Sequence, residues 1–314
     1  MAATTKPRML LVLSENWTLT PGDNLPEVVR WARVAEDAGF DSVMLSEHVV
    51  LGPDASVNGV MGNPRDYAMP GNQDPEMPWP NSLMLLAAMA SVTERLRLVA
   101  AAIIAPLRHP LLLARELGTL DLISQGRLVV QPTVSWSKDE YDALGVPFGQ
   151  RGKILDEQLE VLRLAWAGSP FSFQGKHFDF RDVSLSPRAF HPDGPRLWFG
   201  GQRMSPAVLR RLVRHGHGFH PLGQATAEDL EILGKGMADA GRDLAALEKV
   251  GGTRAVFPDD RSTADIGRAM EPIREQLDQG FTTFCVKPSQ FIDDAAELPS
   301  FCRDVVRRAE AMSS

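Results

Sequence analysis

The sequence predicts an α/β protein of the (β/α)8 TIM-barrel class, with insertions after the second and the fourth strand. Residues 96–136 carry the first observation, because they contain a strand, a helix and a second strand in about forty residues. Such a unit crosses over right-handed, and its strands run parallel. Residues 98–105 are apolar on both faces, which is typical of a parallel strand that helices cover. The second observation is that eight strand patterns alternate with helical patterns, and that the last pattern is helical.

The third observation argues against the main competitor, a doubly wound sheet. That fold carries a glycine-rich turn after its first strand, whereas this chain has Ser14-Glu15-Asn16-Trp17 there. A chain of 314 residues, 44% of them hydrophobic, is also large enough for one extensive core. We therefore expect residues 1–314 to form a single barrel domain.

In the first half of the chain, proline and glycine mark where the elements begin and end. Pro26 suits the first turn of a helix, and Gly39 follows that helix at the position that favours glycine. Pro106 and Pro110 end the third strand and precede the next helix. The expected strands are residues 8–13, 41–45, 98–105 and 128–130, and the expected helices are residues 26–38, 81–93, 111–123 and 151–166.

The second half continues the alternation with shorter strands. Residues 171–180 predict a small hairpin, which is the insertion after the fourth strand. The expected strands are residues 196–199, 218–220, 253–257 and 281–286, and the expected helices are residues 206–215, 227–240, 264–279 and 294–312.

Two segments differ from the ordinary elements of a barrel. Residues 49–80 hold many Gly, Pro and Asn residues with little periodicity, which indicates a lid or binding loop, with disorder as the alternative. Residues 81–93 predict a helix that is apolar nearly all round, although an outer helix normally has a polar face. A partner subunit is the simplest cover, so we expect a homodimer with Leu85 and Met89 at its interface.

Composition and charge exclude several classes of function. The net charge is −7 and no cluster of Lys and Arg occurs, whereas nucleic-acid binding needs a basic face. No apolar run approaches the ~18 residues of a membrane helix, and the first residues fit a strand better than a signal peptide. Cys285 and Cys302 match no metal spacing. We therefore expect a cytoplasmic protein with reduced thiols, without a metal site and without membrane or nucleic-acid partners.

Functional side chains are expected where strands end and helices begin. Glu47 and His48 close the second strand, and an imidazole can hold or deliver a proton near neutral pH. Gly200 and Gly201 precede a helix, so that backbone amides can face an anion. The alternatives are a histidine that only shapes the pocket and a plain tight turn. His109 is more often a structural residue bonded to nearby backbone.

Five sequence elements in order resemble the luciferase-like monooxygenase superfamily, the flavin- and deazaflavin-dependent barrels that include bacterial luciferase. They cover nearly the whole chain: AEDAGFDSVMLSEH (35–48), LRHP with LDLISQGRL (107–110 and 120–128), WSKDEYDALGVPFGQRGKILDE (136–157), PRLWFGG (195–201) and GHGFHP (216–221). The proline-rich segment before Asn81 and the block WSKDEYDALGVPF are most similar to the branch that uses coenzyme F420, a deazaflavin. FMN-dependent relatives share most of the other elements.

The resemblance implies roles for individual residues. It places His48 by the reactive edge of the isoalloxazine ring, with Glu47 near it, as the catalytic pair. It aligns the Ala101-Ala102 bond with a non-prolyl cis peptide that supports the ring. The implied cofactor-binding residues are His48, Ala101, Ala102, Thr133, Ser135, Trp136, and, around the phosphate of the cofactor tail, Gly200, Gly201 and Gln202, to which Arg203 could add a contact.

Residues 131–136 depart from the family pattern. Relatives usually have a glycine-rich turn here that lets the backbone reach the cofactor, whereas this chain reads Gln-Pro-Thr-Val-Ser-Trp. Proline removes one backbone donor, which the hydroxyls of Thr133 and Ser135 could replace toward a phosphate. The alternative is a site that binds the cofactor poorly or binds a different one. Trp17, Trp79 and Trp136 are candidates for the ring and substrate pocket, although most tryptophans belong to the core.

These observations favour a deazaflavin (coenzyme F420)-dependent oxidoreductase that transfers a hydride to or from a small organic substrate. The first alternative is a monooxygenase that uses reduced FMN, and oxygen consumption coupled to turnover would separate the two. The second alternative is a non-catalytic flavin-binding barrel, which failure to bind either cofactor would favour.

Overall fold

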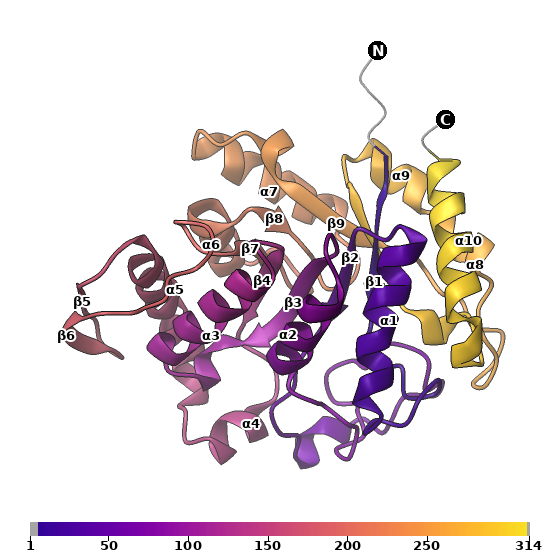
Figure 1. The fold of residues 1–314 in the computed structure, drawn as a ribbon, viewed down its shortest axis with the longest axis horizontal. Coiled ribbons are helices and arrows are strands. Elements are labelled where there is room, and N and C mark those ends of the chain that lie inside the picture. Colours follow the sequence, from indigo (N-terminus) through magenta and orange to yellow (C-terminus); the bar gives the residue numbers. More distant parts are fainter. Residues whose placement is uncertain (1–5, 313–314) are drawn as a thin grey trace.

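The chain forms a closed barrel of parallel strands surrounded by helices, as the sequence predicts. The structure is a computed structural model that describes residues 6–312. The strands follow one another round the barrel in the order β1-β10-β9-β8-β7-β4-β3-β2 (Figure 1). Their bounds are β1 Arg8–Val12, β2 Ser42–Leu45, β3 Arg97–Ile104, β4 Leu128–Thr133, β7 Arg196–Phe199, β8 Gly218–Phe219, β9 Glu248–Gly252 and β10 Thr283–Val286.

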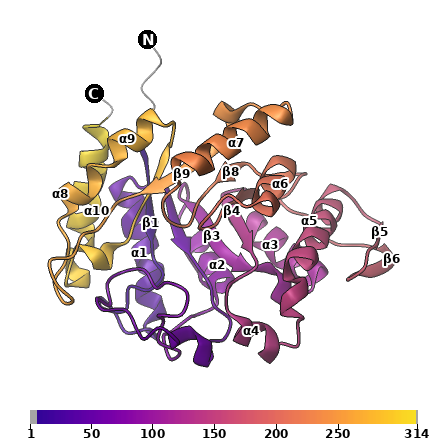
Figure 2. The same ribbon diagram turned by 180° about the vertical axis from the view of Figure 1, so that it is seen from behind.

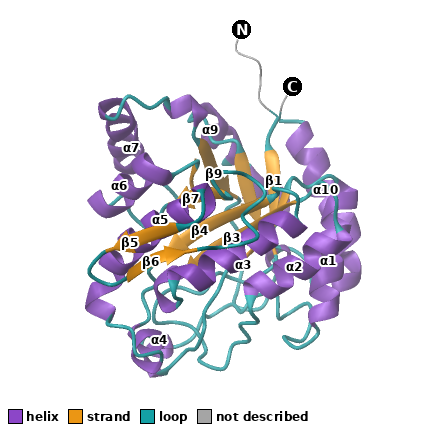
Figure 3. Cartoon of the chain, turned by 60° about the vertical axis from the view of Figure 1, so that its left-hand side comes forward, coloured by secondary structure: helices purple, strands orange, loops and turns teal. Residues whose placement is uncertain are grey.

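Helices cover the outer face of the barrel (Figure 3). The helices are α1 Leu25–Ala38, α2 Ser82–Val92, α3 Pro110–Ile123, α4 Lys138–Ala143, α5 Arg151–Ala167, α6 Pro206–His215, α7 Ala227–Asp239, α8 Ile266–Met270, α9 Ile273–Asp278 and α10 Leu298–Glu310. Gly39 ends α1 with a φ of 95°, a left-handed conformation that favours glycine. The predicted hairpin is present as β5 Phe171–Gln174 and β6 Asp179–Val183, outside the barrel.

Two apolar layers stabilise the barrel, one inside it and one between the strands and the helices. Alternation along each strand produces both layers: in β1, Leu10 and Val12 face inward, whereas Met9 and Leu11 face the helices. The inner layer consists of Leu10, Val12, Met44, Val99, Ala101, Val129, Trp198, Val250 and Cys285. Because side chains fill the barrel, a ligand has room only at its ends.

The carboxyl ends of the strands meet at one end of the barrel, where active sites of this fold lie. The long connection after β2 and helix α4 lie at this end, at the bottom of Figure 1. The reverse view in Figure 2 shows the same arrangement. The connection contains one short 3-10 helix, η1 Pro53–Ser56, and is otherwise irregular, as expected for a lid. We call residues 49–80 the lid.

The predicted seventh strand, residues 253–257, is wrong. The strand is β9, which lies five residues earlier and contains Gly251 and Gly252. A Cβ atom at Gly251 would overlap the end of the Gln276 side chain of α9, so glycine leaves room for this side chain to reach the Gly252 backbone. Strand propensity favours the next segment, but its Val256 is 78% exposed. Packing against the neighbouring helix overrides propensity here.

The predicted helix of residues 264–279 is divided into α8 and α9. Pro272 lies at the break, because proline lacks the N–H that a continuous helix needs and its ring clashes with the preceding turn. The final helix α10 also starts later than predicted, after a short 3-10 helix, η6 Ala295–Glu297. Helix α4 has no counterpart among the predicted elements.

Helix α2 is apolar nearly all round, but its predicted interface residues are placed wrongly. Leu85 and Met89 are 7% and 0% exposed and belong to the core between helices and strands. Met84 is 75% exposed instead. In the described part of the chain, residues 6–312, no helix has both the length and the apolar character needed to cross a membrane.

Candidate active site

His48 lies at the carboxyl end of β2 between two tryptophans. The centre of its ring is 4.9 Å from that of Trp79 and 5.6 Å from that of Trp136, and both pairs meet edge to face. Trp79 belongs to the lid, and Trp136 follows β4. The His48 side chain is 9% exposed. The structure therefore brings together three of the residues that the sequence singles out, His48, Trp79 and Trp136.

A fully buried carboxyl group, that of Glu140 on α4, stands beside His48. Its Oε1 lies 3.2 Å from His48 Nδ1 and accepts a hydrogen bond of 2.8 Å from the Val49 amide. Its Oε2 accepts a hydrogen bond of 2.9 Å from the Ser135 hydroxyl. On the other side of the ring, His48 Nε2 lies 3.3 Å from Nε2 of Gln73 in the lid. Both imidazole nitrogens thus have polar neighbours.

Glu47 faces a different set of partners from His48. Its carboxylate pairs with Arg108 at 2.5 and 2.8 Å and accepts a hydrogen bond of 2.9 Å from the Ile104 amide. Both oxygens are therefore engaged in joining β2 to the end of β3. This arrangement favours a structural role, and the catalytic role of Glu47 stays an untested prediction.

The peptide bond between Ala101 and Ala102 is cis, as the resemblance implies. The register between β3 and β4 shifts at the same place, between Ala101 and Ile103. On the other side of β3, Ala100 pairs with Leu45 of β2. The bulge therefore lies next to the segment that leads to His48.

Gln131, the first residue of the segment that departs from the family pattern, joins β4 to the end of β8. Its side-chain oxygen accepts a hydrogen bond of 2.7 Å from His220 Nδ1, and its amide nitrogen donates one of 3.1 Å to the His220 carbonyl oxygen. Burial lowers the pKa of His220 to about 4, so this imidazole is neutral at neutral pH. Both side chains are buried. The glutamine thus fills an internal position that glycine would leave open.

The two hydroxyls that are predicted to bind a phosphate, those of Thr133 and Ser135, lie in different surroundings. Ser135 has a φ of 54°, the left-handed conformation that a glycine would adopt at little cost, and its hydroxyl donates to Glu140. Thr133 is half-buried at the end of β4. In this structure the Ser135 hydroxyl therefore positions the Glu140 carboxylate. The predicted contacts of Thr133 and Ser135 with a cofactor remain untested.

Gly200 and Gly201 follow β7 under different constraints. A Cβ atom at Gly200 would overlap the His220 carbonyl oxygen, so that glycine is required by the close approach of the chain after β8. At Gly201, no heavy atom of the described residues lies within 4 Å of the Cβ position. The backbone at Gly201 is thus open to a ligand.

The start of α6 lies just beyond these glycines. Ser205 caps the helix, because its side chain accepts a hydrogen bond from the Val208 amide. Gln202 and Arg203 lie between Gly201 and the cap and are exposed. Backbone amides and the helix dipole favour anions at such a terminus, so this turn can accept a phosphate.

The lid is fastened across the mouth of the barrel. Its anchors come from the loops that follow β9 and β10. The contacts are Asn63 with the carbonyl oxygens of Asp259 and Ser262 at 3.1 and 3.0 Å, Arg65 with Asp293, and the carbonyl oxygen of Asp66 with Lys287 Nζ at 2.6 Å. The lid is therefore closed in this structure.

Two buried charges, Glu15 and Lys287, lie under the lid. Glu15 accepts a hydrogen bond of 3.3 Å from the Ala68 amide, and Lys287 Nζ lies 5.1 Å from the centre of the Tyr67 ring. Burial raises the pKa of Glu15 and lowers the pKa of Lys287, and the attraction between the two charges opposes both shifts. Tyr67 packs against the inner apolar layer, so the lid reaches into the barrel mouth.

His109 has a structural place, as expected. Its Nδ1 accepts a hydrogen bond of 3.3 Å from the Leu111 amide and thereby caps α3. Its ring meets Phe178 of the hairpin edge to face, with centres 5.4 Å apart.

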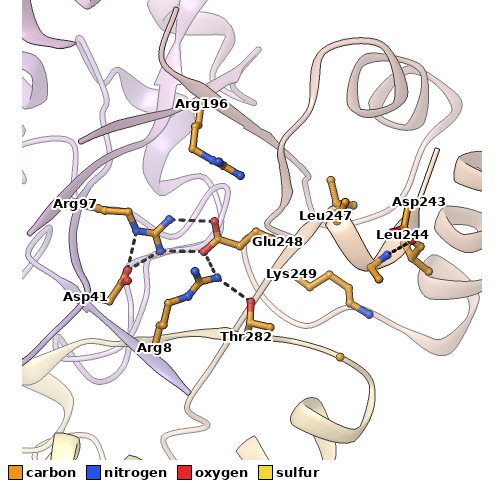
Figure 4. A pocket seen from close by; sticks show the side chains of 13 residues that line it. Arg8, Asp41, Arg97, Arg196, Asp243, Leu244, Leu247, Glu248, Lys249 and Thr282 are labelled. Carbon is orange, nitrogen blue, oxygen red and sulfur yellow. Dashed lines mark hydrogen bonds and ion pairs between the residues drawn. The ribbon is translucent and has the colours of Figure 1, made fainter. Parts of the chain in front are cut away.

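A cavity of about 900 Å³ lies at the opposite end of the barrel, where the strands begin. Figure 4 shows Arg8 and Arg97 pointing toward Glu248, which is the first residue of β9. Arg97 also pairs with Asp41 at 2.5 Å. Residues at this end of a (β/α)8 barrel serve stability, so we assign the cavity to the structural network and not to the active site.

Four polar residues of the mouth have no assigned role in the sequence analysis: Glu15, Gln73, Glu140 and Lys287. Glu15 and Lys287 come soon after β1 and β10, so the strand-end rule that points to His48 could have found them. Gln73 and Glu140 belong to the lid and to α4, and no positional rule connects these segments to His48.

The sequence profile of the luciferase-like monooxygenase family matches residues 9–312. The chain therefore belongs to this family. An uncharacterised protein of Mycobacterium tuberculosis is 28% identical over 270 residues, which cover 78% of this chain and 92% of that protein.

Two solved structures share the fold. The monooxygenase RslO1 from Streptomyces bottropensis has a TM-score of 0.69 at 21% identity, covering 96% of this chain and 98% of its own. The coenzyme F420-dependent tetrahydromethanopterin reductase from Methanopyrus kandleri also has a TM-score of 0.69, at 16% identity, covering 97% and 99%. At these identities the likeness concerns the fold alone, and the equal scores favour neither the monooxygenase nor the reductase.

Proposed function

We propose that this member of the luciferase-like monooxygenase family is a coenzyme F420-dependent oxidoreductase that transfers a hydride to or from a small organic substrate. The observation that carries the proposal is the position of His48, which two tryptophans shelter at the end of β2, the strand that pairs with the one carrying Ala101 and Ala102. When a hydride moves to or from a carbon that bears oxygen, a proton must move as well. An imidazole can hold or deliver that proton.

Each part of the mouth has a role in this proposal. Ala101 and Ala102 would support the ring, and Gly201, Gln202 and Arg203 would hold the phosphate. When bound, the deazaflavin supplies the hydride acceptor or donor, which no side chain can provide. The closed lid would exclude water.

Unpaired polar atoms at the mouth fit such a ligand. Among the described residues, the indole nitrogens of Trp17 and Trp79 and the side-chain oxygen of Gln73 are buried and have no hydrogen-bond partner. Buried polar groups are nearly always paired in folded proteins. A ring system with carbonyl and N–H edges offers them partners, and the open backbone at Gly201 admits a phosphate. The residues present therefore fit a flavin or a deazaflavin.

A reduced-FMN-dependent monooxygenase is the second candidate, because the family includes monooxygenases and one structural neighbour is named as such. A non-catalytic flavin-binding barrel is the third. It is favoured by the side chains of Gln131 and Ser135, which replace the usual glycine-rich turn and bond to other residues of the chain. Gln131 pairs with His220, and Ser135 pairs with Glu140.

A binding titration of the apoprotein separates these candidates. F420 and FMN, each oxidised and reduced, are added while tryptophan fluorescence is followed. Tight binding of F420 with weak binding of FMN is the expected result, and it would justify a screen of alcohols and unsaturated carbonyls. Preferential binding of reduced FMN, with oxygen consumption during turnover, would favour the monooxygenase. Binding of neither cofactor would overturn both enzymatic proposals.

Gly201→Val tests the phosphate site in the same titration. The added side chain would fill the open position and block hydrogen bonds from the backbone to the phosphate, each worth about 1.5–3 kcal/mol for a charged acceptor. We expect the Kd to rise about tenfold or more.

Gly168→Val is the matched control, because Gly168 also has no described heavy atom within 4 Å of its Cβ position and its φ of 179° suits valine. It ends α5, remote from the mouth. Equal affinities in wild type and both variants would place the phosphate elsewhere.

We also propose that the protein forms a homodimer through the outer faces of α2 and α3. These adjacent helices expose Met84 (75%), Leu112 (57%) and Ile123 (47%). Apolar side chains exposed on neighbouring helices are typical of interaction surfaces, and a second copy would cover them with equivalent side chains.

Met84→Asp is expected to halve the mass measured by light scattering after size exclusion, because it buries a charge at this contact. Val256→Asp is the control, since Val256 is equally exposed (78%) but lies after β9. A monomeric wild type, or a dimeric Met84→Asp variant, would contradict the proposed interface.

A further inference from the structure

We propose that Glu140 is a positioning residue that fixes the tautomer of His48, with the proton on Nδ1 and a free lone pair on Nε2. The inference deepens the proposed function, on which it rests for the role of His48 in proton transfer. Glu140 acts only through the imidazole, so it is not itself a catalytic residue.

The contacts of Glu140 are those of an acceptor held in one orientation. The residue is 0% exposed, and its two oxygens accept hydrogen bonds from the Val49 amide and the Ser135 hydroxyl. These two bonds leave Oε1 3.2 Å from His48 Nδ1, which is close enough for electrostatic attraction although the two groups are not aligned as a hydrogen bond. A carboxylate oxygen attracts an N–H group and repels a lone pair. The tautomer with Nδ1–H is therefore favoured on this side of the ring.

The opposite side of the ring fits the same tautomer. The Gln73 amide nitrogen lies 3.3 Å from His48 Nε2. An amide nitrogen can donate but not accept, so in this orientation of the Gln73 amide Nε2 presents a lone pair to it. The two neighbours together favour one tautomer, and a substrate that displaces the Gln73 amide under the closed lid would find on Nε2 a lone pair that can accept its proton.

Helix α4 also joins the segments that must be in register for this arrangement. Glu140 contacts the first residue of the lid, Val49, and the turn after β4 through Ser135. The preceding residue, Asp139, accepts a hydrogen bond of 2.8 Å from the Asp54 amide in the lid. Helix α4 thus anchors the start of the lid and the imidazole with adjacent side chains.

Glu36 provides a matched comparison for a purely structural carboxylate. It is also buried, at 5% exposed, and it accepts hydrogen bonds from backbone amides, including that of Arg95 at 2.6 Å. It lies on α1, and none of its hydrogen bonds involves a histidine. Neutralising Glu36 removes a buried charge of the same kind without touching His48.

Nitrogen-15 NMR of the imidazole tests the proposal on the protein without cofactor. Long-range proton–nitrogen spectra distinguish a protonated from an unprotonated ring nitrogen, and His48→Gln identifies the signal among the seven histidines. We expect Nδ1–H in the wild type. Glu140→Gln should shift the ratio of tautomers toward Nε2–H by about tenfold, the effect of replacing a carboxylate that lies 3.2 Å from Nδ1 by a neutral amide.

Glu36→Gln should leave the His48 tautomer unchanged, and Glu140→Asp, which keeps the carboxylate, should retain a preference for Nδ1–H. Nε2–H in the wild type would overturn the proposal, and this outcome needs no variant to fold. An unchanged ratio in folded Glu140→Gln would also overturn it. Failure of the cofactor titration beside a wild-type Nδ1–H signal would overturn the proposed function and leave this inference standing.

Discussion

Replacing His48 by alanine is expected to lower turnover by about 10²- to 10⁴-fold, which is the usual contribution of a positioned proton donor or acceptor. Cofactor affinity should change far less, because the proposed ring support and phosphate site are made by other residues, Ala101, Ala102 and Gly201. The measurement compares kcat and cofactor Kd of the variant with the wild type, on a substrate found among alcohols and unsaturated carbonyls.

His109→Ala is the matched control for this prediction. His109 follows β3 at the same end of the barrel, but its imidazole caps α3 and packs on Phe178. Its loss should cost about 0.5–2 kcal/mol of stability and leave kcat nearly unchanged. Equal turnover in His48→Ala and wild type would remove His48 from the chemistry.

The order of strands and helices could be predicted from the sequence because it depends on local patterns. Apolar runs, proline and glycine locate seven of the eight strands of the barrel. The exceptions arise from packing. The seventh strand contains Gly251, which has low strand propensity but allows the close approach of the Gln276 side chain. The outward face of α2 also depends on the rotation of the helix, which an all-apolar sequence does not define.

The candidate site could be predicted only where position along a strand defines position in space. His48 and the Ala101-Ala102 bond follow from strand ends and from the family resemblance. Glu140 and Gln73 reach the imidazole because α4 and the lid fold back over the mouth, and their distance from His48 in the sequence carries no signal. The departure at residues 131–135 is also explained only by partners: Gln131 pairs with His220, and Ser135 pairs with Glu140.

Glu248→Ala is expected to lower the free energy of unfolding by about 3 kcal/mol at neutral pH. Glu248 is 5% exposed in its side chain and joins Arg8, Arg97 and Thr283 at the strand starts, as Figure 4 shows for the two arginines. Removing one partner of a buried ion pair leaves the other charge uncompensated, at about 3–5 kcal/mol. We expect a loss at the lower end of this range, because the Arg8 side chain is 41% exposed and water can solvate its charge in the variant. Urea unfolding measures the difference.

The effect of Glu248→Ala should depend on pH in one direction. Burial raises the pKa of Glu248, but the hydrogen bond from Arg97 and the charges of Arg97 and Arg8 outweigh it, so the pKa lies below its ordinary value of 4.5. A lowered pKa stabilises the fold above pH 4.5, and this stabilisation is lost as the pH falls through the folded-state pKa. The difference in the free energy of unfolding between wild type and variant should therefore be largest near pH 7 and shrink in acid.

Glu310→Ala is the control. It breaks the exposed ion pair with Lys6 and should lower the free energy of unfolding by only about 0–1 kcal/mol. Equal losses in the two variants would mean that the network at the strand starts does not stabilise the barrel.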